Sequence, residues 1–175
     1  MSTQDIAAAM ERVEAVLRRR PEHGLHDDAP ATARWQGGTR VVSSHANGAQ
    51  MATDMPTELG GTGDQVSPGW LFRAGLASCL TTCIAMNAAA QGITLATLEV
   101  VAGSRSDTRG VLGMAEADGT PVSPASQDVQ MHVHLSAPGA APERLRELVA
   151  YSYRHSPVPA VLLAATPIAL QVDVG

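Results

Sequence analysis

The chain has 175 residues, which suits one domain with a sizeable hydrophobic core. Hydrophobic residues make up 45% of it and aromatic residues only 3%, so Ala, Val, Leu and Met must fill that core. A formal net charge of −5 leaves no basic stripe and argues against nucleic acid as a partner. The two cysteines cannot form a disulfide framework, and the charged N-terminal residues lack the apolar stretch of a secretion signal, so we expect a cytoplasmic protein.

Residues 4–20 predict an amphipathic helix, which Pro21 ends. Its large apolar side chains recur at helical spacing on one face: Ile6, Met10, Val13 and Leu17. Residues 23–30 are typical of a polar linker. We therefore expect residues 1–24 to form an N-terminal helical extension and residues 25–175 to form a single domain.

Residues 31–54 predict short strands joined by tight turns. Gly37-Gly38 separates strands expected at residues 33–35 and 40–42, and Asn47-Gly48 precedes a third strand expected at residues 50–54. The glycine-rich residues 56–66 lack the spacing of a phosphate-binding loop. We expect them to form the turn that sets how the chain enters the next helix.

Residues 67–92 predict a long helix on which the rest of the fold depends. Ser67 suits the N-cap, Pro68 suits the first helical position, and Gly92 suits the residue that ends the helix. The helix is apolar on nearly every face, which is typical of a buried helix or a membrane span. Arg73 and Asn87 lie within the run and argue against a membrane span, so we expect a central buried helix.

The remainder predicts an antiparallel sheet with two further helices. Strands are expected at residues 94–102, 105–118 and 128–135, helices from residue 142 to 163 with a break at Ser156-Pro157, and a closing strand at residues 167–174. His132 and His134 share one face of their strand, where a solvated sheet surface explains them better than a metal site. The order of elements predicts an α+β fold with antiparallel sheets packed around central helices.

Both cysteines lie on the central helix. Cys79 and Cys83 are four residues apart, so they share one helix face. At that spacing their Cβ atoms are about 5–6 Å apart, too far for a disulfide within the helix. They are either small core residues or reactive thiols, and a reactive thiolate requires a cation brought from elsewhere in the fold.

The residues around the cysteines resemble those of the OsmC/Ohr family, the osmotically inducible and organic-hydroperoxide-resistance proteins. The run SPGWLFRAGLASCL at residues 67–80 resembles the core helix of that family, and ELGG at residues 58–61 resembles its preceding turn. GGTR at residues 37–40 resembles the hairpin that carries an arginine, and SPV at residues 156–158 resembles the second-cysteine segment. The resemblance extends from about Pro30 to the end and implies an OsmC-like fold in an intertwined homodimer.

The resemblance also implies roles for individual residues. In the peroxidases of this family, a helix cysteine attacks the peroxide, an arginine and a glutamate hold it ready, and a second cysteine resolves the sulfenic acid. Cys79 takes the attacking position and Arg40 the position of the arginine. Gly69 stands where the glutamate is expected, and Ser156 stands where the second cysteine is expected.

Three functions follow as alternatives. The first is a thiol-dependent peroxidase that reduces organic hydroperoxides through Cys79 and Arg40 and takes its electrons from an external thiol. The second is a module that binds a small hydrophobic ligand at the dimer interface, and the third is a purely structural role for both thiols. The residues expected to line the site are Trp70, Phe72, Cys83, Met86 and Ser156. No cofactor, metal or membrane partner is expected.

Overall fold

A computed structural model describes residues 2–174, which divide into two compact units. The N-terminal unit is Ala9–Ala74, and the C-terminal unit comprises Gly75 onward together with the first residues up to Ala8. The helices α1 (Thr3–Arg19) and α2 (Pro68–Ala90) each contribute residues to both units.

The N-terminal unit contains a three-stranded antiparallel sheet in the order β1 (Thr32–Trp35), β2 (Val41–Ser44) and β3 (Gln50–Thr53). Trp35 pairs with Val41 across the first hairpin, and Ser44 pairs with Gln50 across the second. The first turn has positive φ at both Gly37 and Gly38, a conformation that glycine adopts without strain. The three strands and both turns predicted for this region are therefore confirmed.

The glycine-rich segment after β3 folds back onto the end of that strand. It contains the short 3-10 helix η2 (Thr57–Leu59) and returns to form an isolated bridge between Thr53 and Val66. A Cβ atom at Gly61 would lie 1.8 Å from the carbonyl oxygen of Met55, so only glycine fits there. This close approach brings residues 62–66 beside the end of β3.

The helix α2 begins and ends within two residues of its predicted limits. The Ser67 hydroxyl accepts a hydrogen bond from the backbone N–H of Trp70 at 3.2 Å, and Gly92 ends the helix with positive φ. By length and composition alone this is a helix that could cross a bilayer, a test that the core helices of soluble proteins also meet.

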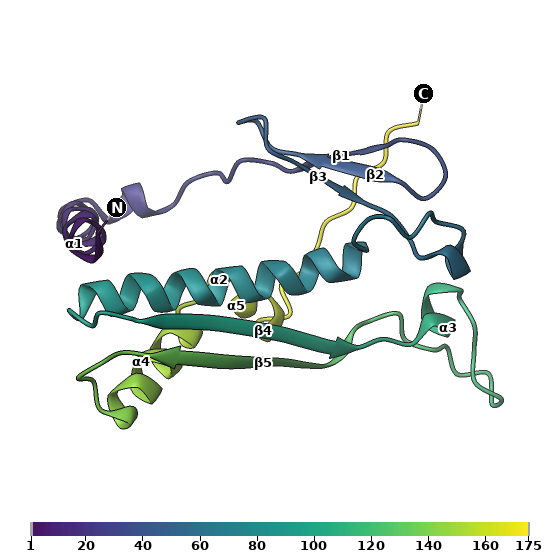
Figure 1. The fold of residues 1–175 in the computed structure, drawn as a ribbon. Helices are drawn as coiled ribbons and strands as arrows, with labels where there is room; N and C mark the ends of the chain where they lie inside the picture. The colour runs from purple at the N-terminus through teal and green to yellow at the C-terminus, as the bar shows by residue number, and fades with distance from the viewer. Residues whose placement is uncertain (1, 175) are drawn as a thin grey trace. The chain divides into compact units, whose positions relative to one another are not determined.

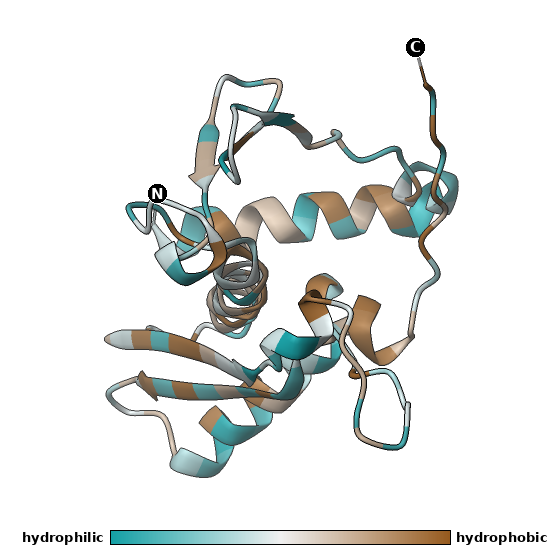
Figure 2. Ribbon diagram, turned by 90° about the vertical axis from the view of Figure 1, so that its right-hand side faces the viewer, coloured by the Kyte–Doolittle hydropathy of each residue, from teal (hydrophilic) through white to brown (hydrophobic). Residues whose placement is uncertain are grey.

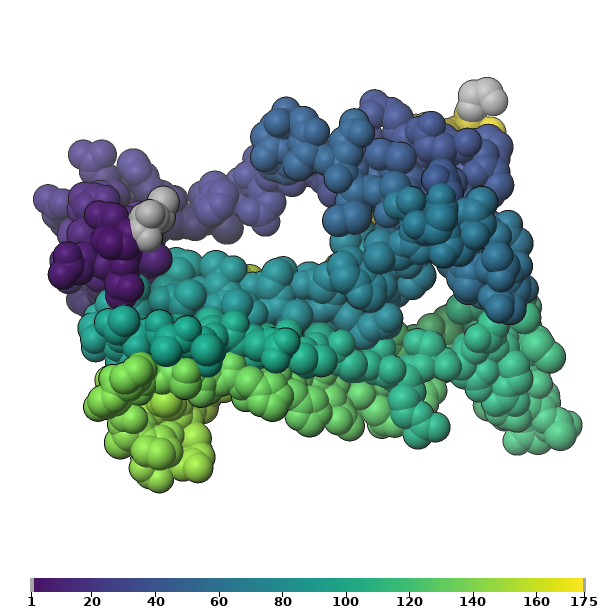
Figure 3. Space-filling view, viewed as in Figure 1, coloured from purple at the N-terminus to yellow at the C-terminus, as the bar shows by residue number. Residues whose placement is uncertain are grey.

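In the C-terminal unit, α2 packs along a two-stranded antiparallel sheet formed by β4 (Thr97–Arg105) and β5 (Gln127–Ser136) (Figure 1). Apolar and polar residues alternate along most of both strands (Figure 2). The apolar side chains that pack against the core cluster are Leu98, Val100, Met131, Val133 and Leu135. The core cluster consists of Leu80, Ile84, Ala88 and Leu148, with half-buried side chains from both strands around it. In the space-filling view α2, β4, β5 and α4 form one continuous body (Figure 3).

Two helices complete this unit, α4 (Pro142–Arg154) and α5 (Pro157–Leu163). Leu148 of α4 is buried in the core cluster, and Ser156 lies between the two helices as the N-cap of α5. The predicted break at Ser156-Pro157 is confirmed.

The strand predicted at residues 105–118 is wrong beyond Arg105, because the chain there turns into the short helix α3 (Thr108–Val111). The Asp107 side chain caps α3 by accepting from the backbone N–H of Arg109, whose side chain also pairs with Asp107 and Glu116. A Cβ at Gly110 would lie 2.4 Å from the Ser123 carbonyl oxygen, so the loop closes tightly on this glycine.

The closing strand predicted at residues 167–174 is also wrong for the single chain. The alternating apolar pattern is present, but Ile168 is 94% exposed and Leu170 is 86% exposed. A strand requires a neighbouring strand to accept and donate its backbone hydrogen bonds, and among the described residues this segment has none.

The predicted N-terminal helix is confirmed as α1, followed by the 3-10 helix η1 (Pro21–Gly24). No residue of α1 is buried within the described chain, and Val13 on its apolar face is exposed. Burial of that face, like the domain boundary at residue 24, stays a prediction.

Leu80→Ala is expected to lower the free energy of unfolding by about 2–5 kcal/mol, because it leaves a cavity in the core cluster. Thr82→Ala, on the exposed side of the same helix, is the matched control and should change it by less than about 0.5 kcal/mol. Urea unfolding followed by circular dichroism at one fixed protein concentration measures both. Equal effects of the two substitutions would contradict the assignment of the core.

Candidate functional site

One row of polar side chains on α2 faces the junction between α4 and α5. Cys79, Cys83 and Asn87 follow each other at intervals of four residues, so they lie on one helix face. All three are half-buried, and each contacts a different residue of the junction. The row brings both thiols of the protein to one place.

Ser156 donates a hydrogen bond from its hydroxyl to the Sγ atom of Cys79 at 3.2 Å. An N-cap serine normally accepts from the backbone N–H of the second or third helical residue. Here the third residue is Pro159, which has no N–H, and Ser156 makes no capping bond from its side chain. Because Ser156 is fully buried, Cys79 is the partner that satisfies its hydroxyl.

Cys83 has the opposite hydrogen-bond role. Its thiol donates to the backbone carbonyl oxygen of His155, with 3.9 Å between sulfur and oxygen. Burial raises the pKa of Cys83 above its usual value; the Ser156 hydroxyl acts against this rise and the neighbouring Cys79 adds to it. The raised pKa favours the thiol of Cys83 over its thiolate.

Asn87 and Ser152 fix the junction against α2. The side-chain amide of Asn87 donates to the Ser152 hydroxyl at 3.1 Å, and that hydroxyl donates to the Leu148 carbonyl oxygen at 2.8 Å. Ser152 is fully buried. The contact sets the position of α4, and hence of Ser156, relative to the thiols.

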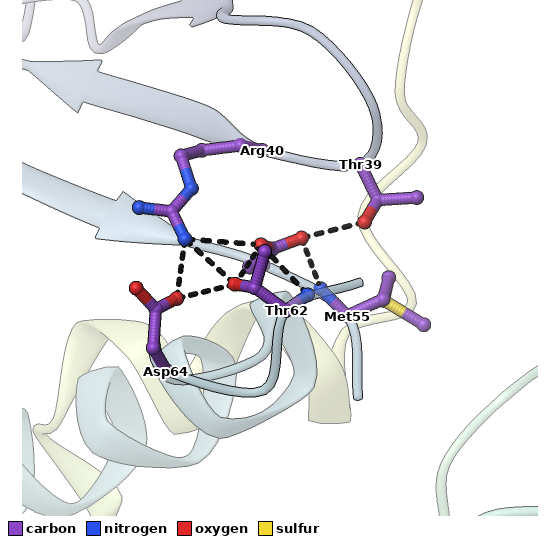
Figure 4. A network of polar contacts seen from close by, with 6 residues as sticks. Thr39, Arg40, Met55, Thr62 and Asp64 are labelled. Atoms are coloured by element: carbon purple, nitrogen blue, oxygen red, sulfur yellow. Dashed lines mark hydrogen bonds and ion pairs between the residues drawn. The ribbon is translucent and has the colours of Figure 1, made fainter. Parts of the chain in front are cut away.

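Arg40 lies in the N-terminal unit, where it belongs to a polar network (Figure 4). Its Nη2 atom donates to the Thr62 hydroxyl at 2.7 Å and to carboxylate oxygens of Asp54 and Asp64. Asp54 is only 2% exposed and also accepts from the Thr39 hydroxyl at 2.5 Å. Two carboxylates thus hold the guanidinium of Arg40.

The network stabilises both carboxylates in their charged form. Hydrogen bonds from the hydroxyls of Thr39 and Thr62 hold the pKa of Asp54 well below its usual range, against the effect of burial. The Thr62 hydroxyl and the Arg40 guanidinium likewise lower the pKa of Asp64. The arginine is therefore anchored by Asp54 and Asp64, which lie in its own unit.

The structure brings three of the predicted site residues together: Cys79, Cys83 and Ser156. Met86 lies on the same helix and is 40% exposed. Trp70, 44% exposed, and the half-buried Phe72 belong with Arg40 to the N-terminal unit. A role for these three beside Cys79 stays a prediction.

Sequence reasoning missed two groups of residues. Asn87 was recognisable in part, since it lies one helical turn after Cys83 on α2. Ser152 lies on α4 four residues before Ser156, which is outside that helix, so the spacing gave a weaker signal. The aspartates and threonines around Arg40 gave no such signal, because residues 14 to 24 positions away in the sequence meet there.

The described residues contain no group of three or more His, Cys, Asp or Glu side chains that could hold a metal ion. His132 and His134 lie on the exposed face of β5, where His134 pairs with Glu99 of β4.

Comparison with known proteins identifies the family. The OsmC-like protein family matches residues 61–171, more than half of the chain, so the chain belongs to that family. No functionally curated protein matches the sequence. The resemblance inferred from the thiol helix is therefore confirmed, together with the α+β OsmC-like fold of antiparallel sheets and helices.

Solved structures agree on the fold. An OsmC-like protein from Mycoplasma pneumoniae aligns with a TM-score of 0.66 at 17% identity over 81% of this chain and 92% of its own. An organic hydroperoxide resistance protein from Legionella pneumophila aligns with a TM-score of 0.56 at 22% identity, over 79% of this chain and 90% of its own. A third structure is that of a putative organic hydroperoxide resistance protein from Vibrio cholerae, which holds captopril in one of its active sites. It aligns with a TM-score of 0.50 at 22% identity, over 78% of this chain and 87% of its own.

Acid is expected to destabilise the N-terminal unit through Asp54. Its folded-state pKa lies below the unfolded value, so the stability it contributes is complete above about pH 4 and is lost as the pH falls below that. Asp54→Asn should lower the melting temperature at neutral pH and flatten its fall in acid. Melting followed by the fluorescence of Trp35 and Trp70, both in this unit, measures the effect.

Glu58→Gln is the matched control, because this exposed carboxylate lies in the same loop. It should leave the pH dependence unchanged. An acid transition that Asp54→Asn does not alter would contradict the importance of the network.

Proposed function

We propose that this protein is a thiol-dependent peroxidase that reduces organic hydroperoxides through Cys79. The observation that carries the proposal is the hydrogen bond from the buried Ser156 hydroxyl to the Cys79 sulfur, at the position where the family resemblance puts the attacking cysteine. A donor aimed at sulfur favours the thiolate, which is the nucleophile. Membership of the OsmC-like family supports the substrate class.

The proposed reaction is a two-electron oxidation of sulfur. The Cys79 thiolate attacks the terminal peroxide oxygen, the O–O bond breaks, and the alkoxide takes a proton from solvent and leaves as an alcohol. The sulfur keeps the transferred hydroxyl group and becomes a sulfenic acid. An external thiol then forms a disulfide with Cys79 and hydroxide leaves as water, after which a second external thiol releases Cys79 and yields the external disulfide.

An external reductant is part of the proposal because the chain has two cysteines and they are four residues apart on one helix. Their Cβ atoms are about 5–6 Å apart at this spacing, whereas a disulfide requires about 3.8 Å. The cytoplasm, the proposed compartment, supplies such thiols.

We propose Arg40 as the arginine of the peroxidase site, in line with the family resemblance. Asp54 and Asp64 hold its guanidinium, which supports a role for them in place of the glutamate that Gly69 replaces. A carboxylate introduced at residue 69 would start from a Cβ position 3.7 Å from the Arg73 Nη1 atom, so Arg73 rather than Arg40 is its nearest cation.

Cys79→Ser is expected to reduce consumption of cumene hydroperoxide, with dithiothreitol as reductant, to the uncatalysed rate. Cys83→Ser keeps the proposed nucleophile and should retain consumption. Peroxide loss is measured by a ferrous-oxidation assay, and the sulfenic acid is mapped by dimedone trapping and mass spectrometry. Consumption that persists in Cys79→Ser would overturn the proposal.

A second candidate function is the binding of a small hydrophobic ligand without turnover. The large exposed side chains of Trp70 and Met86 favour it, as does the captopril held by the Vibrio cholerae protein. If the wild type consumes no peroxide but cumyl alcohol quenches its tryptophan fluorescence saturably, this second function replaces the first.

The proposal includes a homodimer. Only 17% of the apolar stretch of α2 is buried within one chain, and the C-terminal segment exposes a row of large apolar residues at alternate positions: Ile168, Leu170, Val172 and Val174. A second copy offers the apolar cover and the strand edge that these elements need.

Light scattering is expected to give a mass of about 36 kDa at micromolar concentration, twice the 18.1 kDa of one chain. Replacing Ile168 and Leu170 with Asp should shift the mass toward 18.1 kDa, because charges would replace the apolar side of the segment. Gln171→Asp, on the alternate side, is the control and should leave the dimer intact. The homodimer would be contradicted if the folded wild type had the mass of one chain, or if the protein partitioned into lipid vesicles.

A further inference from the structure

We infer that Ser156 is the positioning residue that selects Cys79 over Cys83 as the reacting thiol and then holds the oxidised sulfur without resolving it. The inference deepens the proposed function and rests on it for the oxidation step. The selection between the two thiols, however, depends only on the hydrogen bonds of the site and can be tested without any peroxide.

The hydroxyl of Ser156 is directed to sulfur by its own sequence context. Pro157 and Pro159 occupy the first and third positions of α5, so two of the backbone N–H groups at its start are missing. The serine makes no capping bond through its side chain, is fully buried, and donates to Cys79 at 3.2 Å. A buried donor of this kind stabilises an anionic sulfur more than a neutral thiol.

The same junction disfavours the thiolate of Cys83. Its sulfur faces the carbonyl oxygen of His155, which accepts the thiol proton and would repel a negative charge. The Ser156 hydroxyl lies near both sulfurs but carries one proton, and the structure directs that proton to Cys79. A charged Cys79 further disfavours ionisation of Cys83, since the two like charges would lie one helical turn apart.

After oxidation the role of Ser156 changes. The sulfenic acid oxygen on Cys79 is a new acceptor beside a buried hydroxyl, and the hydrogen bond can pass from sulfur to oxygen. A hydroxyl cannot displace hydroxide to form a disulfide, as a thiol at this position would. The oxidised protein therefore accumulates as the sulfenic acid until an external thiol reaches it.

Alkylation with iodoacetamide tests the selection. In a Cys83→Ser background, where Cys79 is the only thiol, Ser156→Ala should slow alkylation about tenfold at neutral pH and move the rate profile to higher pH. Thr81→Val is the matched control, because it removes a part-buried hydroxyl close to Cys79 in sequence, one that donates to the Ala77 carbonyl oxygen instead of to sulfur. It should leave the profile in place.

A profile that is unchanged in Ser156→Ala, or shifted equally in Thr81→Val, would overturn the inference. Either outcome would leave the proposed peroxidase standing if Cys79 still consumes hydroperoxide. Conversely, a protein that consumes no hydroperoxide but shows the shift in Ser156→Ala alone would retain the selection and lose the peroxidase.

Ser156→Cys tests the second part and does not depend on the alanine variant folding. One equivalent of cumene hydroperoxide should leave the wild type trapped by dimedone at Cys79. The variant should instead lose two free thiols to an internal disulfide and lose dimedone labelling. Two results would contradict the role of Ser156 in holding the sulfenic acid. One is dimedone labelling that persists in the folded variant, and the other is a wild type that consumes hydroperoxide but is not labelled.

Discussion

The contact between α2 and the α4–α5 junction is the interaction on which the C-terminal unit depends. On the side of the sheet, α2 buries Leu80 and Ile84 in the core cluster with Leu148. On the adjoining face it carries Cys79, Cys83 and Asn87 against a junction whose two serines are fully buried. Apolar burial supplies the stabilisation, while the polar row fixes how the helices are rotated and shifted, since a displaced helix would leave buried hydroxyls without partners.

The same polar row makes the two thiols chemically different. Cys79 accepts a hydrogen bond and Cys83 donates one, although they occupy equivalent positions on successive turns of one helix. The difference comes from the chain opposite, where a backbone carbonyl precedes a serine that is not used as a side-chain cap. A short proline-containing turn therefore sets the chemistry of a helix 72 to 77 residues away in the sequence.

In the N-terminal unit, the main polar network holds the side chain of Arg40 in one position. Arg40 follows a turn of two glycines and would be mobile if its guanidinium were solvated. Asp54, at the end of β3, and Asp64, in the glycine-rich segment, anchor it from two sides. Their combined charge exceeds that of the arginine, and the hydroxyls of Thr39 and Thr62 add hydrogen bonds to the two carboxylate oxygens of Asp54.

The sequence by itself determined the helices α1, α2, α4 and α5, the first three strands, the α+β class and the family, because caps, turn glycines and apolar periodicity are local signals. That Gly69 and Ser156 stand where the family has a glutamate and a second cysteine stays a prediction of the resemblance. Only the tertiary structure decided that residues 108–111 form a helix, that residues 167–174 lack a strand partner within the described chain, and that Asp54 and Asp64 hold Arg40. Each of these depends on what a segment meets from a distant part of the chain, and neither periodicity nor spacing carries that information.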